Sequence, residues 1–381
     1  MQYARIARSA RSVRLAYFTV FLGAGVWLPY MPLYLASLGL DGWQIGFLGA
    51  LTPGVRWVSA IWLGWVADRR RVRQRLLVAT AAAGSLCFIP LLFVRDFPTL
   101  IVVFLAINAF HGTLIPMVDA IVVDHLAELG NDYGRLRLWG SLSFIVGSAG
   151  SAPLVYAYGT PVIPLLLVLP QILLAPVMLL LPRGQRGHPD HARAPWALVT
   201  PAMATFLVTV FLAQASAGAW SGFFALHVRA LGLSDSIPGL TFGLAVVAEV
   251  ALFHWGRRVL DWIPPADLIL LTVVVTVVRW ALSAVVTGEA AVVLVQLGHV
   301  FTFSAFHLAS VALVAELVPP ANATSGQSLY GLMGYGVGGT VGIALAGALV
   351  DRLGTPGLFW FEAAVALAAV GPAWMLRRLR R

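Results

Sequence analysis

Long apolar stretches, separated by short polar connections, make up most of this chain. A membrane-spanning helix needs about 20 consecutive, mostly apolar residues, and stretches of that length recur along the whole sequence. Pro and Gly interrupt many of them, which membrane helices tolerate because neighbouring helices and polar side chains satisfy the freed backbone groups. The pattern predicts an all-α membrane protein with twelve transmembrane helices, near residues 15–38, 43–66, 76–94, 98–125, 134–158, 161–181, 200–227, 238–256, 267–287, 290–316, 325–350 and 356–376.

Composition supports this prediction and excludes most other classes. With 60% hydrophobic and 11% charged residues and a mean hydropathy of +0.87, the chain has too little charged surface for a soluble domain of its size. The net charge of +9 comes from arginines that follow a membrane pattern instead of forming a basic face, so we expect no nucleic acid partner. Cys87 is the only cysteine and lies in an apolar run, where it is expected to be a small buried hydrophobe.

The distribution of arginine predicts the orientation. Cytoplasmic loops of membrane proteins carry an excess of Lys and Arg. Placing the N-terminus in the cytoplasm puts only Arg95, Arg229 and Arg352 on the outer side, and twenty of the 25 basic residues on the cytoplasmic side. We therefore expect a multi-pass protein of a bacterial-type inner membrane with both termini cytoplasmic. The arginines before the first apolar run resemble the start of a signal peptide, but the run is too long and lacks a cleavage site, so it is interpreted as an uncleaved span.

The longest polar interval divides the twelve spans into six and six. We expect an N-terminal six-helix bundle over residues 1–182, a central cytoplasmic linker over 183–199 and a C-terminal six-helix bundle over 200–381. Weak internal repetition favours this division. Leu38-Gly39-Leu40 recurs as Leu231-Gly232-Leu233, and Ala109-Phe110-His111 recurs as Ala305-Phe306-His307, at offsets of 193 and 196 residues. Two matches at nearly one offset indicate a duplicated half.

Four ionisable residues lie deep inside the predicted spans: Arg56, Asp119, Glu249 and Arg279. A charge at the centre of a lipid-facing helix costs roughly 2.5–3.5 kcal/mol on insertion scales, so such residues usually face a polar cavity on a substrate or ion path. No cluster with metal-ligand spacing and no cofactor loop accompanies them, which argues against a membrane enzyme and gives no reason to expect a cofactor. The pattern therefore predicts a transporter of a small molecule.

The hairpin of spans 4 and 5 carries a candidate ion pair. Asp119 and Arg137 lie symmetrically about the turn, so antiparallel helices would bring them to the same depth. Such a pair could bind substrate or simply lock two helices together. Asn108 shares the face of Asp119 on span 4 and is a candidate substrate contact. Arg56, in the middle of span 2, is either a second contact or a packing residue paired to a backbone carbonyl.

Span 10 carries a polar and aromatic stripe. The 100° step of a helix places these residues on one side, where they would line a cavity: Gln296, His299, Phe303, Phe306 and His307. Gln296 is a candidate substrate contact. His299 and His307 can change protonation near neutral pH, although a buried hydrogen-bonding role is equally open for either of them.

The loop between spans 2 and 3 reads Gly64-Trp65-Val66-Ala67-Asp68-Arg69-Arg70-Arg71-Val72-Arg73. It resembles the loop motif of the major facilitator superfamily, in which the acid and the basic residues latch neighbouring helix ends. The resemblance implies gating roles for Gly64, Asp68 and Arg69. The usual Gly two places after the acid is Arg70 here. A positive-inside cluster would explain the arginines equally well, but not the Gly64–Asp68 spacing.

Within that superfamily, the chain resembles the phenylpropionate permease family along nearly its whole length. The segments with counterparts, in order, are Leu15-Ala16-Tyr17-Phe18-Thr19, Leu28-Pro29, Asp132-Tyr133-Gly134, Arg137-Leu138-Trp139-Gly140-Ser141, Val246-Val247-Ala248-Glu249-Val250, Val277-Val278-Arg279-Trp280 and His307-Leu308-Ala309. The resemblance implies the major facilitator fold and proton-driven uptake of small substrates.

The lactose permease group is more distantly similar. Its sugar-binding acid on span 4 and Arg on span 5 are separated as Asp119 and Arg137 are here, by 18 positions, and Phe144 stands where that group has an aromatic residue that stacks on the sugar. The resemblance implies substrate binding by all three residues.

The same group matches Glu249, Arg279 and His299 in the second half. There the corresponding residues serve substrate binding and proton coupling, and His307 joins them here as a candidate proton carrier. The match departs elsewhere, because residues that are charged in that group are replaced in this chain by Thr302, Gln296, Gly218 and Ser221. The lactose mechanism therefore does not transfer unchanged.

Together these residues predict proton-coupled uptake of a small organic substrate. Arg56, Arg137 and Arg279 could bind an anion, and the aromatic-rich spans suit a ring, which favours an aromatic carboxylate such as 3-phenylpropionate. A proton symporter for a neutral oligosaccharide or a nucleoside is the alternative, favoured if Asp119 and Arg137 hold hydroxyl groups. The expected partners are the substrate, protons and the lipid bilayer, and we expect a monomer.

Overall fold

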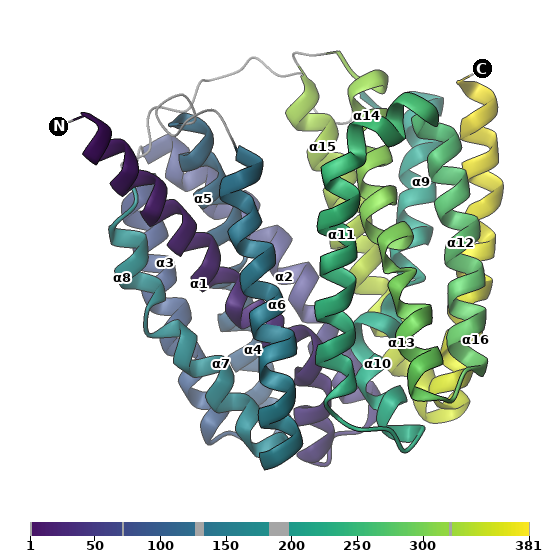
Figure 1. Cartoon of the computed structure of the whole chain (residues 1–381), viewed down its shortest axis with the longest axis horizontal. Coiled ribbons are helices and arrows are strands. Elements are labelled where there is room, and N and C mark those ends of the chain that lie inside the picture. Colours follow the sequence, from purple (N-terminus) through teal and green to yellow (C-terminus); the bar gives the residue numbers. More distant parts are fainter. Residues whose placement is uncertain (1, 71, 126–132, 183–197, 320–321, 381) are drawn as a thin grey trace. The chain divides into compact units, whose positions relative to one another are not determined.

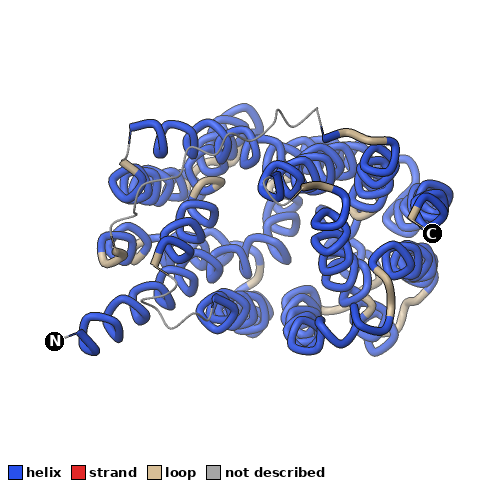
Figure 2. Tube along the Cα trace, turned by 90° about the horizontal axis from the view of Figure 1, so that it is seen from above, coloured by secondary structure: helices blue, strands red, loops and turns tan. Residues whose placement is uncertain are grey.

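The computed structural model describes residues 2–70, 72–125, 133–182, 198–319 and 322–380, with side chains from residue 10 onward except those of Asp68, Arg257 and Thr324. Within this part of the chain every regular element is helical (Figure 2). The expected linker 183–199 lies outside the described residues except for Leu198 and Val199.

Contacts between Cα atoms divide the chain into two compact units. Unit 1 comprises Met1–Leu40, Gly54–His188 and Ser234–Gly243, and unit 2 comprises Asp41–Pro53, Pro189–Leu233 and Leu244–Arg381.

The first half of the chain forms these elements (Figure 1): α1 Gln2–Ser37, α2 Gly42–Arg70, α3 Arg73–Phe88, the short 3-10 helix η1 Ile89–Leu92, α4 Phe97–His111, α5 Leu114–Asp124, α6 Tyr133–Tyr158, the 3-10 helix η2 Thr160–Val162, α7 Ile163–Gln171 and α8 Leu174–Leu179. Several predicted spans are therefore broken. The span near 98–125 is divided at Gly112 and Thr113 into α4 and α5, and the span near 161–181 is divided into α7 and α8.

The second half follows with α9 Pro201–Ala215, α10 Gly218–Ala230, α11 Ile237–Trp262, α12 Pro265–Val285, α13 Glu289–Leu297, the π-helical segment η4 Val300–Ala305, α14 Phe306–Leu317, α15 Ala323–Gly331, a second π-helical segment η6 Leu332–Gly338 and α16 Gly339–Leu379. The span near 200–227 is divided at Ser216 and Ala217, and the span near 290–316 is widened by η4. Single π-helical turns are frequent at functional sites.

Ten helical stretches of the described chain are long and apolar enough to cross a membrane. Two differences separate this number from the twelve predicted spans. The span near 43–66, in α2, is not among the ten, and the spans near 325–350 and 356–376 are counted together as the 55-residue stretch Ser325–Leu379. That stretch is not one continuous helix, because Gly354 has a left-handed φ of 66° and marks a kink.

Glycines bring the helices of unit 1 into close contact. A Cβ at Gly25 of α1 would lie 2.4 Å from the carbonyl oxygen of Phe144, and one at Gly147 of α6 would lie 2.4 Å from that of Leu22. Gly112, at the break between α4 and α5, similarly approaches the backbone of Arg56, where a Cβ would lie 2.6 Å from the Arg56 Cα. Small residues at helix interfaces allow this backbone approach, and the last contact fixes the position of Arg56 against α4.

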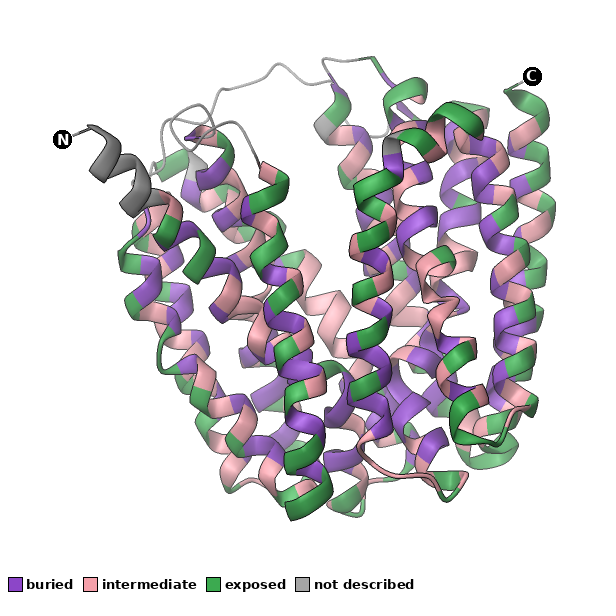
Figure 3. Ribbon diagram, in the orientation of Figure 1, coloured by how far each residue is buried: buried purple, intermediate pink, exposed green. Residues whose placement is uncertain are grey.

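Unit 2 is organised around a broken helix. The break between α9 and α10 lies against α16, since a Cβ at Gly218 would lie 2.1 Å from the carbonyl oxygen of Gly342. On the α9 side of the break, a buried apolar core includes Phe206, Val210, Ile269, Phe306 and Leu313. Buried and exposed residues alternate along each helix, as one-sided packing requires (Figure 3). Most buried side chains are apolar, and the polar residues described below are exceptions.

Candidate functional site

Arg279 of α12 is the centre of a polar cluster in unit 2. Its guanidinium donates to Gln296 Oε1 and to Thr302 Oγ1, both at 2.5 Å, and lies 3.3 Å from His299 Nδ1. The indole rings of Trp220 and Trp280 lie 5.1 and 4.4 Å from it, close enough for cation–π attraction. Arg279 is 3% exposed, so these contacts replace its hydration.

His299 links Arg279 to Glu249 of α11. Its Nε2 lies 3.0 Å from Glu249 Oε1, while its ring stacks on Trp220 with centroids 4.2 Å apart. The three residues that the sequence singled out in the second half thus form one chain from Glu249 through His299 to Arg279. A proton on His299 can be stabilised by the carboxylate on one side and destabilised by the guanidinium on the other.

Gln296 and the rest of the span 10 stripe divide into two environments. Gln296 is buried, donating to Ser283 Oγ at 3.0 Å and accepting from Arg279. Phe303 stacks between His299 and His307, with centroid distances of 5.4 and 6.1 Å. Phe306 is instead part of the apolar core. The widened turn of η4, which contains Phe303, accompanies this alignment of residues four apart.

His307 forms a second hydrogen-bonded group with two tyrosines. Its Nδ1 lies 2.9 Å from the Tyr330 hydroxyl and 3.3 Å from the Tyr335 hydroxyl, and those two hydroxyls are 3.1 Å apart. Tyr335 belongs to η6, so both π-helical segments border this group. Among the described residues, His307 has hydroxyl partners and no carboxylate partner.

Glu362 of α16 is a functional candidate that the sequence reasoning missed. It is 2% exposed, and it accepts hydrogen bonds from the backbone N–H groups of Ala219 and Trp220, in the first turn of α10. It therefore caps a helix that begins inside the unit. Its other oxygen, Oε2, has no hydrogen-bond partner among the described residues, and Glu362 interacts electrostatically with Arg279. A Glu within the apolar run Trp360–Ala366 was the available signal.

In unit 1, Tyr17 of α1 connects Asp119 and Arg137. The Tyr17 hydroxyl donates to Asp119 Oδ1 at 2.5 Å, while the Arg137 guanidinium lies over the rings of Tyr17 and Phe21, 5.4 and 4.1 Å from their centroids. The direct Asp119–Arg137 pair expected from the hairpin is not formed among the described contacts. The hairpin supplies two helices, α5 and α6, whereas the contact between their charged residues is completed by a third, α1.

Arg56 of α2 has a neutral partner. Its Nε donates to Asn108 Oδ1 at 2.9 Å, and the Asn108 amide in turn donates to the Phe104 carbonyl at 2.8 Å. No carboxylate pairs with Arg56 among the described residues. The packing alternative expected a hydrogen bond from Arg56 to a backbone carbonyl. Among the described contacts, Arg56 donates to the side-chain amide of Asn108 instead. Phe144 is 8% exposed and lies on the α6 face that packs on α1 near Gly25.

The charges inside the two units are unequal and opposite. Unit 1 holds Arg56 and Arg137 against Asp119, whereas unit 2 holds Arg279 against Glu249 and Glu362. With all of these groups ionised, unit 1 carries one surplus positive charge and unit 2 one surplus negative charge. Charges in apolar surroundings are stable only when paired or neutralised, so each unit keeps one interior charge that these residues do not neutralise.

The loop motif is only partly visible. Gly64 has open space around the position of a Cβ, and the Arg69 guanidinium lies 5.0 Å from the ring of Trp65. The side chain of Asp68 lies outside the described residues. Nearby, Arg73 and Asp124 form an ion pair of 2.8 Å, which ties α3 to α5 at the end of each helix.

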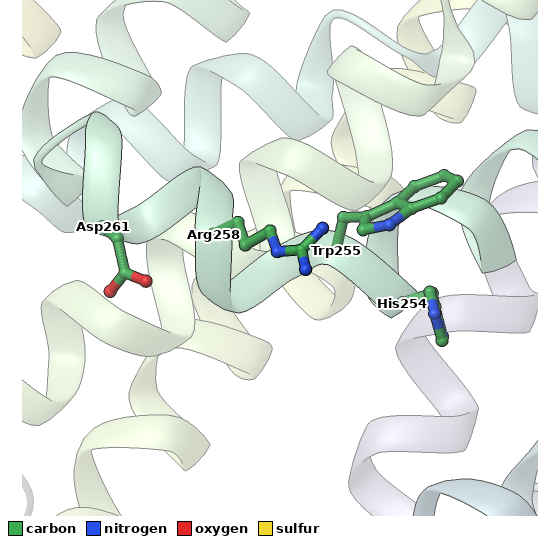
Figure 4. A pocket seen from close by; sticks show the side chains of 4 residues that line it. All are labelled: His254, Trp255, Arg258 and Asp261. Carbon is green, nitrogen blue, oxygen red and sulfur yellow. The ribbon is translucent and has the colours of Figure 1, made fainter.

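A small pocket of about 250 Å³ lies on the last turns of α11. Figure 4 shows its lining side chains, His254, Trp255, Arg258 and Asp261, all from this helix. None of the residues predicted from the sequence lines it, and we assign it no part in the site.

Comparison with known proteins identifies the family of this chain. Residues 11–361 match the family model described as MFS_1 like family. The chain is 30% identical to a probable 3-phenylpropionic acid transporter of Escherichia coli (strain K12), covering 96% of this chain and 97% of the relative. It is 24% identical to a maltose permease of Geobacillus stearothermophilus, covering 89% and 87%.

Solved structures show the same fold. The nucleoside transporter NupG aligns with a TM-score of 0.80 at 18% identity, covering 98% of this chain and 99% of that one. A bacterial homologue of the lysosomal transporter Spinster aligns with a TM-score of 0.71 at 14% identity, covering 97% and 96%. With helices long enough to span a membrane and a family match over most of its length, the chain belongs to the MFS_1 like family and is a multi-pass membrane transporter, not an enzyme.

Proposed function

We propose that the protein takes up a small aromatic carboxylate together with a proton. The observation that carries this proposal is Arg56, a cation inside the apolar part of unit 1 whose hydrogen-bond partner is the neutral amide of Asn108. A guanidinium without a carboxylate partner can bind one from a substrate through charge-assisted hydrogen bonds. The similarity to a probable 3-phenylpropionic acid transporter supports the same substrate class.

The second part of the proposal concerns the proton. Glu249 and His299 lie 3.0 Å apart beside Arg279, so protonation of this group changes its charge next to a fixed cation. His307 is a less direct candidate, because its contacts are with tyrosine hydroxyls.

The membrane arrangement is proposed as twelve spans in two six-helix bundles. A 55-residue stretch would measure about 80 Å as one helix, far more than the roughly 30 Å of a hydrocarbon core, so the kink at Gly354 divides it into two spans. On α2, Val58, Ile61, Trp62 and Trp65 are exposed at helical spacing, which fits contact with lipid despite Arg56. The arginine distribution supports a bacterial inner membrane location with both termini in the cytoplasm, and we propose a monomer.

A neutral oligosaccharide or nucleoside is the second candidate substrate. Asp119 has the Tyr17 hydroxyl as its partner and Arg137 faces aromatic rings, so both charged groups could accept or donate to sugar hydroxyls. The maltose permease relative and the NupG fold are compatible with this alternative.

Purified protein in proteoliposomes distinguishes these substrates. External pH is recorded after adding 3-phenylpropionate, maltose or a nucleoside. Alkalinisation with 3-phenylpropionate alone is the expected result, whereas alkalinisation with maltose or the nucleoside alone would favour the second candidate. Absence of any pH change with all three would contradict proton coupling to these substrates.

Asn108→Asp tests the role of Arg56. The new carboxylate would occupy the guanidinium at the present 2.9 Å contact and so compete with an anionic substrate. Because a hydrogen bond to a charged group contributes about 1.5–3 kcal/mol, we expect affinity for 3-phenylpropionate to fall roughly 10- to 100-fold. Asn108→Ser, which removes the amide without adding charge, is the control and should lose less. Equal losses in the two variants would contradict anion binding at Arg56.

A further inference from the structure

We propose that Glu362 is the group that takes up and releases the transported proton, acting beside Arg279. This inference rests on the proton coupling proposed above and names the carrier. Glu362 is buried in α16 and faces the start of α10, where α9 and α10 are separated by a break. It is not among the candidate residues predicted from the sequence.

The polar cluster around Arg279 contains more acidic groups than basic ones. Arg279 lies within electrostatic reach of two carboxylates, those of Glu362 and Glu249, and it forms a direct ion pair with neither of them among the described contacts. With His299 neutral, one cation faces two anions in apolar surroundings. Isolated buried charge is costly unless it is paired or neutralised, so the cluster is balanced when it holds one proton.

Glu362 is better placed than Glu249 to hold that proton. Glu249 already has a partner, since His299 Nε2 lies 3.0 Å from its Oε1. Glu362 uses one oxygen to accept from backbone N–H groups of α10, but its Oε2 is buried without a hydrogen-bond partner in the described part of the chain. An ionised oxygen left in this way is unfavourable. A proton on Oε2 removes the charge while the other oxygen continues to cap α10.

Charged and titratable groups surround Glu362 on several neighbouring helices. Arg279 faces it from α12. From α10, His227 lies against Phe359, one turn before Glu362 in α16, with ring centroids 4.9 Å apart. His299, just before η4, contacts the same guanidinium, and Glu249 of α11 contacts His299 in turn. A change in the contacts of Arg279 therefore changes the electrostatic stabilisation of the ionised Glu362 carboxylate. A conformational change driven by substrate could release the proton in this way.

Glu362→Gln separates proton carriage from capping. The glutamine carbonyl can still accept from the N–H groups of Ala219 and Trp220, but the amide cannot take up a proton. Glu362→Ala removes both functions. Glu289→Gln, at an exposed carboxylate in the first turn of α13, is the matched control. We expect substrate-driven proton movement in proteoliposomes to fall to the level of empty liposomes in Glu362→Gln and to be unchanged in Glu289→Gln.

Infrared difference spectroscopy gives a readout that does not depend on transport. During a pH titration of the full-length protein, the wild type should show a carboxylic acid C=O band that is absent from Glu362→Gln and shifted in Glu362→Asp. The inference is overturned if the band persists in Glu362→Gln, or if that variant moves protons with substrate as the wild type does. If the wild type moves no protons with any substrate, the proposed coupling fails, while the titration still decides whether Glu362 takes up a proton.

Discussion

Tyr17 shows how a single hydroxyl can determine the pairing of charges. Asp119 and Arg137 are both contacts of this residue, one through its hydroxyl and the other through its ring. Tyr17 thereby keeps an acid and a base near each other without a direct bond. A side chain that holds two opposite charges apart leaves both available to a substrate, whereas a closed ion pair would not.

Tyr17→Phe tests this role. The ring under Arg137 remains, but Asp119 loses the Tyr17 hydroxyl and keeps only that of Tyr133, which leaves it more available to Arg137. Because a hydrogen bond to a charged group contributes about 1.5–3 kcal/mol, we expect the specificity constant for transport to fall roughly tenfold or more. Initial uptake rates over a range of substrate concentrations measure it.

The same chemical change at Tyr156, which is 74% exposed on α6, is the control and should have no effect. Equal rates in Tyr17→Phe and Tyr156→Phe would show that the hydroxyl of Tyr17 is dispensable.

At the scale of elements, glycine contacts determine which polar residues meet. Gly25 and Gly147 bring α1 and α6 together, and this contact sets Tyr17 of α1 beside Arg137 of α6. In unit 2, Gly218 and Gly342 bring the start of α10 against α16, where Glu362 caps it. In both units, therefore, the close approach of two helices at glycines brings the polar side chains into contact.

Gly25→Ala should therefore destabilise the fold. The added Cβ would lie 2.4 Å from the Phe144 carbonyl oxygen, and backbone cannot move aside as a flexible side chain can. Overpacking of this kind typically costs about 1–3 kcal/mol, measured as a lower midpoint of thermal unfolding in detergent.

Gly150→Ala in α6 provides the comparison, since its Cβ would meet only Val146, at 3.9 Å. It should leave the midpoint unchanged or raise it, because Ala is favoured over Gly inside a helix. A similar fall in both variants would indicate a general effect of replacing glycine rather than the close approach.

For the whole molecule, apolar length and arginine distribution predict a multi-pass membrane protein, because the bilayer imposes both. The residues grouped around Arg279 were also predictable, since Gln296 and His299 are neighbours on one helix. Glu362 was not, because it approaches from α16 to cap a break in α10 that the sequence pattern does not reveal. Tyr17 was missed for a related reason: its hydroxyl reaches Asp119 across 102 positions of sequence.

The predicted orientation can be measured by labelling. Cys87 is the only cysteine, so Cys87→Ala gives a background without thiols. In it, Tyr158→Cys should react with a membrane-impermeant maleimide added to intact cells, and Trp262→Cys should react only after the cells are opened. Both positions are well exposed, at 69% and 84%, so accessibility within the protein is matched. The reverse pattern would place both termini outside.

The opposite charges of the two units lead to a rule about which forms of the carrier can reorient. With its acids ionised, the empty protein keeps one surplus cation in unit 1, where Arg56 and Arg137 face Asp119, and one surplus anion in unit 2, where Glu249 and Glu362 face Arg279. An anion bound alone neutralises unit 1 but leaves the surplus anion of unit 2, and a proton bound alone leaves the surplus cation of unit 1, which costs several kcal/mol in apolar surroundings. Binding both restores neutrality. Substrate and proton would then be coupled by electrostatic energy, because only the carrier loaded with both has no surplus charge in either unit.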